Sequence, residues 1–196
     1  MRVDLLESQA RSIGIPLVKM EIPEAPTMEE YEACMSEHMT TLKNEGAQHS
    51  IFGDIFLEDL RAYRETKLQE VEIEGVFPLW KRPTKELIRE FLDLGFKTVV
   101  TCVNDQLLDK SFAGRIIDED FLNDLPEGVD PCGENGEFHT FVFDGPIFNE
   151  PIAYSIGEVV HRKYEVKESK EEADYDCEPD PKKVVPGFWY CDLLPK

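Results

Sequence analysis

The sequence predicts an α/β protein in which a parallel sheet is followed by a smaller α+β region. From the start of the chain to about Val103, segments with helical spacing of apolar residues alternate with short apolar or β-branched runs. This alternation is typical of βαβ units with right-handed crossovers. Beyond Val103 the alternation stops, and antiparallel strands with loops are expected. We therefore expect two regions, 1–103 and 104–196, with the boundary near Asn104.

The helices of the first region are predicted from apolar spacing and from residues that end or cap helices. Gly14 follows the first helix, where a left-handed C-terminal cap is expected. Thr27 and Glu30 have the spacing of a capping box at the start of the second. The expected helices are 2–13, 27–46, 57–71 and 83–95, and the expected strands are 16–22, 49–53, 75–80 and 96–103. The last strand is β-branched, which suits burial on both faces.

The second region is expected to contain a short helix and three strands. The helix covers 118–125, and the first strand begins at Phe138. In this strand, Phe138, Thr140 and Val142 share one face, and His139, Phe141 and Phe143 share the other. Residues 157–166 are predicted to be its hairpin partner, 165–181 a charged solvated loop, and 187–194 the last strand.

Composition limits the function classes. The net charge is −20, from 41 acidic and 21 basic residues, and a field of that sign repels a nucleic-acid backbone. There is neither a run of roughly 18 apolar residues nor an apolar leader with a cleavage site, so no membrane role is expected. The five cysteines form no CxxC pair, which favours free thiols in a reducing compartment. We expect a cytoplasmic protein.

The stretch GENGE, residues 133–137, is the first candidate site. Gly133 and Gly136 permit positive φ, and a tight turn could aim Glu134 and Glu137 at one point. Such a pair would suit Mg²⁺, an ammonium nitrogen or general-base work. The alternative is a hairpin turn with solvated acids and a histidine, His139, in the core. No resident metal is expected from Cys132, Glu134 and His139, because their spacing fits no standard site.

A second candidate site lies where the strand 49–53 ends and a helix begins. Ligands of open α/β sheets bind at the carboxyl ends of strands. Gly53 would allow a nucleotide to approach the backbone, Asp54 could accept from a ribose hydroxyl or base amine, and Arg61 and Arg64 could reach phosphates. The alternative is that Asp54 caps the helix and the arginines pair with neighbouring acids.

Six stretches, in chain order, resemble the diphthine–ammonia ligase family of ATP-binding proteins, and most closely its compact, adenine nucleotide alpha hydrolase-like branch. They are GIPLV, FGDIFLEDLRAYRE, FPLW, LGFKTVVTCVN, LDKSFAGRIID and CGENGEFHTFVFDGPIF. The resemblance implies a Rossmann-like, HUP-type ATP pyrophosphatase (PP-loop) fold. It also implies use of ATP and Mg²⁺ to adenylate a carboxylate, after which ammonia displaces AMP to give an amide.

The resemblance assigns roles to particular positions. Gly53, Asp54 and Arg64 would bind the nucleotide, and Glu134 and Glu137 would be catalytic on the acceptor side. Gly133, Gly136, His139 and Thr140 would form the acceptor loop. The family's phosphate loop, S-G-G-K-D-S after its first strand, is not in this sequence, so the first strand and this loop are expected to be missing.

Three functions follow as hypotheses. The first is an ATP-dependent amide-forming ligase, inactive if the shortened chain cannot bind triphosphate. The second is a nucleotide-binding or interaction module without ATP chemistry, and the third is a hydrolase of a nucleotide α-phosphate. The expected partners are ATP and a carboxylate-bearing acceptor, which in the family can be a protein side chain, together with a possible second copy of the chain.

Overall fold

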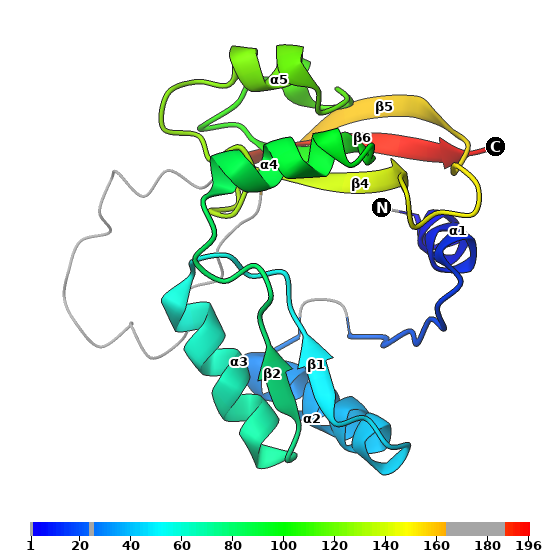
Figure 1. Ribbon diagram of the computed structural model, residues 1–196, viewed down its shortest axis with the longest axis vertical. Helices are drawn as coiled ribbons and strands as arrows, with labels where there is room; N and C mark the ends of the chain where they lie inside the picture. Colours follow the sequence, from blue (N-terminus) through cyan, green and yellow to red (C-terminus); the bar gives the residue numbers. More distant parts are fainter. Residues whose placement is uncertain (1, 24–25, 164–186) are drawn as a thin grey trace. The chain divides into compact units, whose positions relative to one another are not determined.

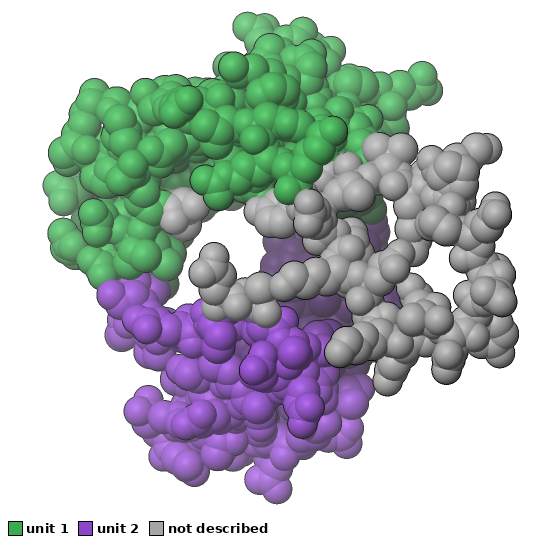
Figure 2. Space-filling model, turned by 180° about the vertical axis from the view of Figure 1, so that it is seen from behind, with its two compact units in different colours: residues 1–15, 88–196 green, residues 16–87 purple. Residues whose placement is uncertain are grey.

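The computed structural model describes residues 2–23, 26–163 and 187–196. It divides into two compact units, which are coloured separately in Figure 2. Unit 2 is residues 16–87, and unit 1 combines residues 1–15 with 88–196. The chain passes from one unit to the other after residues 15 and 87, whereas the expected boundary near Asn104 lies inside unit 1. The predicted loop 165–181 and residues 164–166 of the predicted hairpin strand lie outside the described residues.

Unit 1 is built on a four-stranded antiparallel sheet in the order β4-β3-β6-β5 (Figure 1). Its strands are β3 (Lys97–Asn104), β4 (Phe138–Asp144), β5 (Tyr154–Lys163) and β6 (Gly187–Pro195). The prediction of β3 as a strand buried on both faces is confirmed, since Val99, Val100 and Val103 are fully buried. Its placement in a parallel sheet is wrong, because β3 pairs antiparallel with both β4 and β6.

The expected hairpin between β4 and β5 is also absent from the described sheet. β5 pairs with β6, for example Val160 with Tyr190, whereas β4 pairs with β3. The physical reason is competition for the edges of β3, the most apolar strand. Once β4 and β6 occupy its two edges, β5 can join only at an outer edge of the sheet, and it pairs along β6 from Tyr154 to Lys163.

Each face of the sheet has its own core. On one face, α4 (Thr84–Asp93), the 3₁₀ turn η1 (Lys110–Phe112) and α5 (Glu119–Asp124) cover a cluster around Phe121. The Phe121 ring contacts Phe112 and Phe138 edge-on, each with 5.6 Å between ring centroids. On the other face, Leu5 of α1 (Val3–Ile13) packs with Phe141. Phe138 and Phe141 thus lie on opposite faces, as predicted.

Unit 2 contains one βαβ unit and a further helix. Its elements are α2 (Met28–Asn44), β1 (His49–Ile51), α3 (Glu58–Glu70) and β2 (Glu74–Val76). β1 and β2 are parallel, so this βαβ prediction is confirmed. The capping box of Thr27 and Glu30 is also confirmed.

The strand predicted over 16–22 is not formed. In the described part of the chain this segment belongs to no sheet, and Leu17 and Val18 are 37% and 63% exposed. A β-branched, apolar segment needs an adjacent strand edge to form a ladder, and the short sheet of β1 and β2 does not provide one for it. The observed fold is therefore mixed α/β, with a parallel pair of strands and a separate antiparallel sheet.

None of the helices in the described residues is long and apolar enough to cross a membrane.

We expect Phe121→Ala to lower the free energy of unfolding of unit 1 by about 3–5 kcal/mol, because it leaves a cavity between two aromatic rings. Urea unfolding can be followed by Trp189, which packs against this cluster, in a Trp80→Phe background. Leu107→Ala, at a side chain that is 43% exposed, should change the unfolding free energy much less. Equal losses in both variants would contradict the assignment of Phe121 to the core.

Candidate functional site

The turn of residues 133–137 is held together by the carboxylate of Glu137. This side chain is only 2% exposed. Its Oε1 accepts hydrogen bonds from the backbone N–H of Asp130 at 3.0 Å and from Asn135 Nδ2 at 2.9 Å. Its Oε2 accepts from the backbone N–H of Asn135 at 2.8 Å. The carboxylate thus closes the turn on itself instead of pointing to a shared site with Glu134.

Two opposing effects set the protonation of Glu137. Burial by itself raises the pKa of the carboxyl, but hydrogen bonds from Asn135 and Asp130 together outweigh it, so the pKa is lowered. A carboxylate with a lowered pKa and committed acceptors is a weak proton acceptor. The contacts of Glu137 are those of a positioning residue.

Gly133 is required by the shape of this turn. It has φ of +72°, in the left-handed region, and a Cβ at this position would lie 2.8 Å from the carbonyl oxygen of Phe138. Gly136 also has positive φ, +80°, but with open space around it. Both glycines therefore serve the backbone of the turn, as the sequence predicted.

Glu134 is the other carboxylate of the turn, and it is half-buried. Its backbone N–H donates to Oδ2 of the buried Asp130 at 3.1 Å. The nearby Cys132 thiol has its pKa raised to about 12, first by burial and then by the charges of Asp130 and Glu134. The thiol is therefore protonated at neutral pH, which does not suit a metal ligand. Over the residues that the structure describes, no cluster of three or more metal-ligating side chains is found.

His139 and Thr140 follow the turn and are exposed, so His139 is not the core histidine of the alternative interpretation. Both line a groove of 780 Å³ on the sheet of unit 1. Residues from all four strands contribute to this groove, and they include Thr101 of β3, Arg162 of β5 and Tyr190 of β6. The turn and the groove are therefore continuous through β4.

The predicted nucleotide residues belong to unit 2. Arg64 Nε lies 2.8 Å from Asp54 Oδ2, and the guanidinium lies over the ring of Phe52, 4.5 Å from its centroid. Both atoms of the ion pair are buried, yet their geometry is not that of a hydrogen bond. Asp54 does not cap α3, whose N-cap residue is Leu57. Gly53 has open space where a Cβ would be.

Arg61, the second arginine of this helix, is engaged elsewhere. Its Nε lies 2.8 Å from Glu65 Oε1. Its guanidinium lies 4.5 Å from the Phe77 ring centroid and 4.6 Å from that of Trp80. These contacts support a structural role for Arg61.

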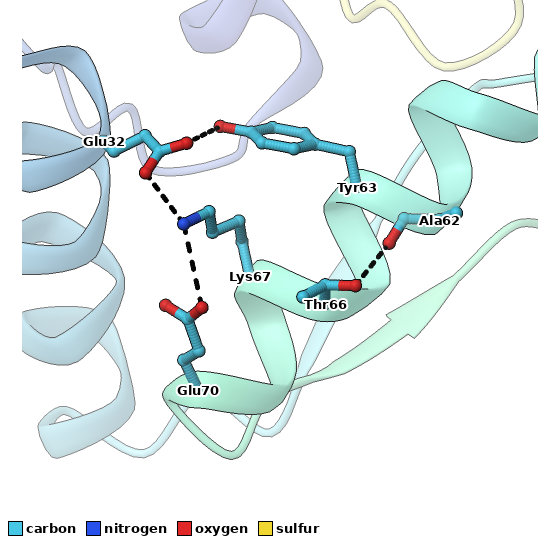
Figure 3. Close-up of polar contacts among 6 residues, drawn as sticks. All are labelled: Glu32, Ala62, Tyr63, Thr66, Lys67 and Glu70. Atoms are coloured by element: carbon cyan, nitrogen blue, oxygen red, sulfur yellow. Dashed lines mark hydrogen bonds and ion pairs between the residues drawn. The ribbon is translucent and has the colours of Figure 1, made fainter. Parts of the chain in front are cut away.

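Sequence reasoning missed a polar network between α2 and α3 (Figure 3). Lys67 Nζ lies 2.8 Å from Glu32 Oε2 and 3.7 Å from Glu70 Oε1, and the Tyr63 hydroxyl donates to Glu32 at 3.3 Å. The hydrogen bond from Lys67 lowers the pKa of Glu32. A hollow of 360 Å³ lies beside this network, and Phe52 and Arg64 are among its lining residues. Only the Lys67–Glu70 spacing was visible in the sequence, because Glu32 lies on another helix.

Glu137→Gln tests the closing role of the carboxylate. The amide would place a donor against a backbone N–H, which should reduce stability at pH 7 by about 1–3 kcal/mol. Because the folded pKa of Glu137 lies below its ordinary value of 4.5, its contribution is present above pH 4.5 and is lost as pH falls through the folded pKa. The variant should therefore show a flatter dependence of stability on pH below 4.5. Glu134→Gln is the matched control, and an equal effect there would contradict this role.

Comparison with known proteins gives two results. Residues 83–174 match the family model of the diphthamide synthase C-terminal domain. Three relatives named diphthine–ammonia ligase are similar to the chain over different lengths. The Homo sapiens protein is 25% identical over 170 residues, 79% of this chain and 64% of its own length. The Danio rerio protein is 27% identical over 81% of this chain and 67% of its own length. The Schizosaccharomyces pombe protein is 28% identical over 52% of this chain and 18% of its own length.

The family model begins at residue 83 and includes the turn, β4 and the groove-lining residues of β3, β4 and β5. The chain spans about 64% of the length of the Homo sapiens relative. The motifs, the matched C-terminal domain and the similarity of most of the chain to these ligases agree. Together they support the resemblance of this chain to the diphthine–ammonia ligase family.

Proposed function

We propose that this chain takes part in ATP-dependent amide formation of the diphthine–ammonia ligase type. The acceptor carboxylate attacks the α-phosphorus of ATP and pyrophosphate leaves. Ammonia then attacks the acyl carbon of the adenylate, one proton is lost from nitrogen, and AMP leaves. The observation that best supports this proposal is the preorganised turn of residues 133–137, which is fixed to the end of a strand whose next residues open onto a groove.

On the acceptor side, the two glutamates have different proposed roles. Glu134 would take the proton from the incoming ammonia or orient Mg²⁺, because it is the half-buried carboxylate of the turn. Glu137 would position Glu134 by holding the backbone of Asn135. Gly133 and Gly136 permit the turn, and His139 and Thr140 would contact the acceptor in the groove.

On the nucleotide side, Gly53, Asp54 and Arg64 are the proposed contacts. Asp54 and Phe52 fix the Nε edge and one face of the Arg64 guanidinium. Within the described ranges, no side chain is seen to pair with its two terminal nitrogens, which fits binding of a phosphate oxygen. When bound beside these residues, ATP would supply the activating AMP group and Mg²⁺ would neutralise its phosphates. The parallel β1–α3–β2 unit supports a Rossmann-like, HUP-type arrangement for this region.

The test of the reaction is an assay of the natural polypeptide that contains these 196 residues. It is supplied with ATP, Mg²⁺, ammonia and a candidate carboxylate acceptor, and AMP, pyrophosphate and amide are measured together. The proposal requires one AMP and one pyrophosphate per amide formed. ATP cleavage that is independent of acceptor would support an α-phosphate hydrolase. Nucleotide binding without turnover under any condition would support a binding module.

Glu134→Gln should lower kcat on the order of 10²-fold, because it removes the proposed proton acceptor while keeping the size of the side chain. The measurement is amide formation at saturating ATP over a range of pH. Glu127→Gln, at an exposed residue before the turn, is the matched control and should be unchanged. An unchanged rate in Glu134→Gln would remove Glu134 from the catalytic assignment.

Arg64→Met should weaken ATP binding about tenfold, because a charge-assisted contact to phosphate is lost while the apolar stem is kept. Equilibrium dialysis with labelled ATP measures this without any reaction. Lys85→Met removes the same charge from an exposed site in unit 2 and should leave the affinity within about twofold. Equal weakening in both variants would mean that only the overall charge matters.

A further inference from the structure

The groove of unit 1 follows one row of residues that crosses the whole sheet. His139 of β4 is paired with Cys102 of β3, Cys102 with Tyr190 of β6, and Tyr190 with Val160 of β5. All four residues line the groove. Neighbouring strands lie about 4.8 Å apart, so the three steps of this row span about 14 Å.

This row lies on the sheet face that α1 covers only in part. Leu5 of α1 packs with Val99, Phe141 and Leu193. These three residues lie on β3, β4 and β6, two or three positions away from the row. The irregular pairing between Val100 and Cys102 changes which side chains of β3 point to this face of the sheet. The row is therefore the open end of a face whose other end is core.

The two ends of the row differ in chemistry. His139 stands at one end, next to the turn that contains Glu134. At the other end, Glu158 and Arg162 lie two residues on either side of Val160 on the same face of β5, and both line the groove. Their Cα atoms are about 13 Å apart along the strand, and the described side chains form no ion pair with either of them.

Other ionisable groups of the groove are already engaged. Asp192 accepts two hydrogen bonds from Arg2, at 3.0 and 2.7 Å, and the hydrogen bond to Arg2 lowers the pKa of its carboxyl. Burial raises the pKa of the Cys102 thiol, and the interaction with the Tyr190 side chain offsets only part of this effect. The Arg162 guanidinium lies 6.0 Å from the ring centroid of Tyr190, a contact that leaves its N–H groups able to bind a carboxylate. Arg162, Glu158 and His139 are therefore the ionisable groups that can recognise a ligand.

The shape of the groove favours an extended chain. It is open, contains hydroxyl groups and crosses four strands, unlike the enclosed apolar pockets that hold most small molecules. A length of about 14 Å corresponds to roughly four residues of extended polypeptide. In such a segment successive side chains point to opposite sides, so one of two adjacent residues can contact Arg162 while the other contacts Glu158.

We propose that the row His139–Cys102–Tyr190–Val160 binds an extended segment of an acceptor protein, with Arg162 and Glu158 as specificity-determining residues. The segment places its reacting residue beside His139. At its other end, about 14 Å away, two neighbouring residues, one acidic and one basic, contact Arg162 and Glu158 respectively. This inference rests on the proposed function, since it names the class of the acceptor. In a chain with net charge −20, Arg162 supplies the local attraction that an acidic residue of the segment needs.

The test is a binding measurement in the absence of ATP and ammonia, so that it is independent of the proposed reaction. The probes are blocked hexapeptides of glycine and serine, one with a terminal glutamate–lysine pair and one with serine in both of those positions. Amide chemical shifts of the ¹⁵N-labelled chain should change at Thr101, Val160 and Tyr190 with the charged probe. Arg162→Glu should weaken its binding about tenfold or more.

Lys163→Glu is the matched control, because it makes the same change of charge at the neighbouring residue on the opposite face of β5. It should change the affinity by no more than about twofold. Unchanged shifts at Leu5 and Phe141 confirm that each variant is folded. The proposal is overturned if the two variants weaken binding equally, if the serine probe binds as well, or if the shift changes lie outside the groove. Failure of amide formation with intact peptide binding would count against the proposed function alone.

Discussion

The buried carboxylate of Glu137 is the constraint on which the arrangement of the candidate site depends. A charged group that is 2% exposed must have its lost hydration replaced, and here two backbone N–H groups and one side-chain amide replace it. These donors come from Asp130 and Asn135, so the carboxylate joins the start of the turn to its middle. The carbonyl of Glu137 accepts from the backbone N–H of Asn104, which fixes the same residue to the end of β3. One residue therefore sets both the shape of the turn and its place on the sheet.

The groove is a consequence of how β3 is paired. Because β3 is central, β4 and β6 lie on its two edges, and β5 extends the sheet on the far side of β6. This order brings His139 and Arg162, which are 23 positions apart in sequence, onto one face of one sheet. α1 packs on the same face only where Phe141 and Leu193 are buried, so the end that contains His139 stays open. The polar row and the core cluster are thus two parts of the same surface, divided by the extent of one helix.

Local features of the fold were predictable because their causes are local. The capping box of Thr27 and Glu30, the left-handed Gly14 and the alternation of Phe138 and Phe141 depend on neighbours within a few positions. Strand partners were not predictable in this way. The segment 16–22 has strand-forming residues but no ladder in the described structure, and β5 pairs with β6 instead of β4. The burial of the Glu137 side chain was not predicted, because a glutamate in a glycine-rich turn is usually solvated. Its burial depends on a hydrogen bond from Asp130, seven residues earlier.

The sequence by itself carried the resemblance to the diphthine–ammonia ligase family, through motifs such as GENGEFHTFVFDGP, and it determined the helices and the glycines at which a turn is required. It also placed the residues of interest close to strand ends. The tertiary structure decided which carboxylate is buried, that Arg64 is held between Asp54 and Phe52, and that a groove crosses four strands. The division follows from the range of the interactions. Backbone propensity and capping act over three or four residues, whereas burial, ion pairing and strand order depend on which distant segments compete for the same apolar surface.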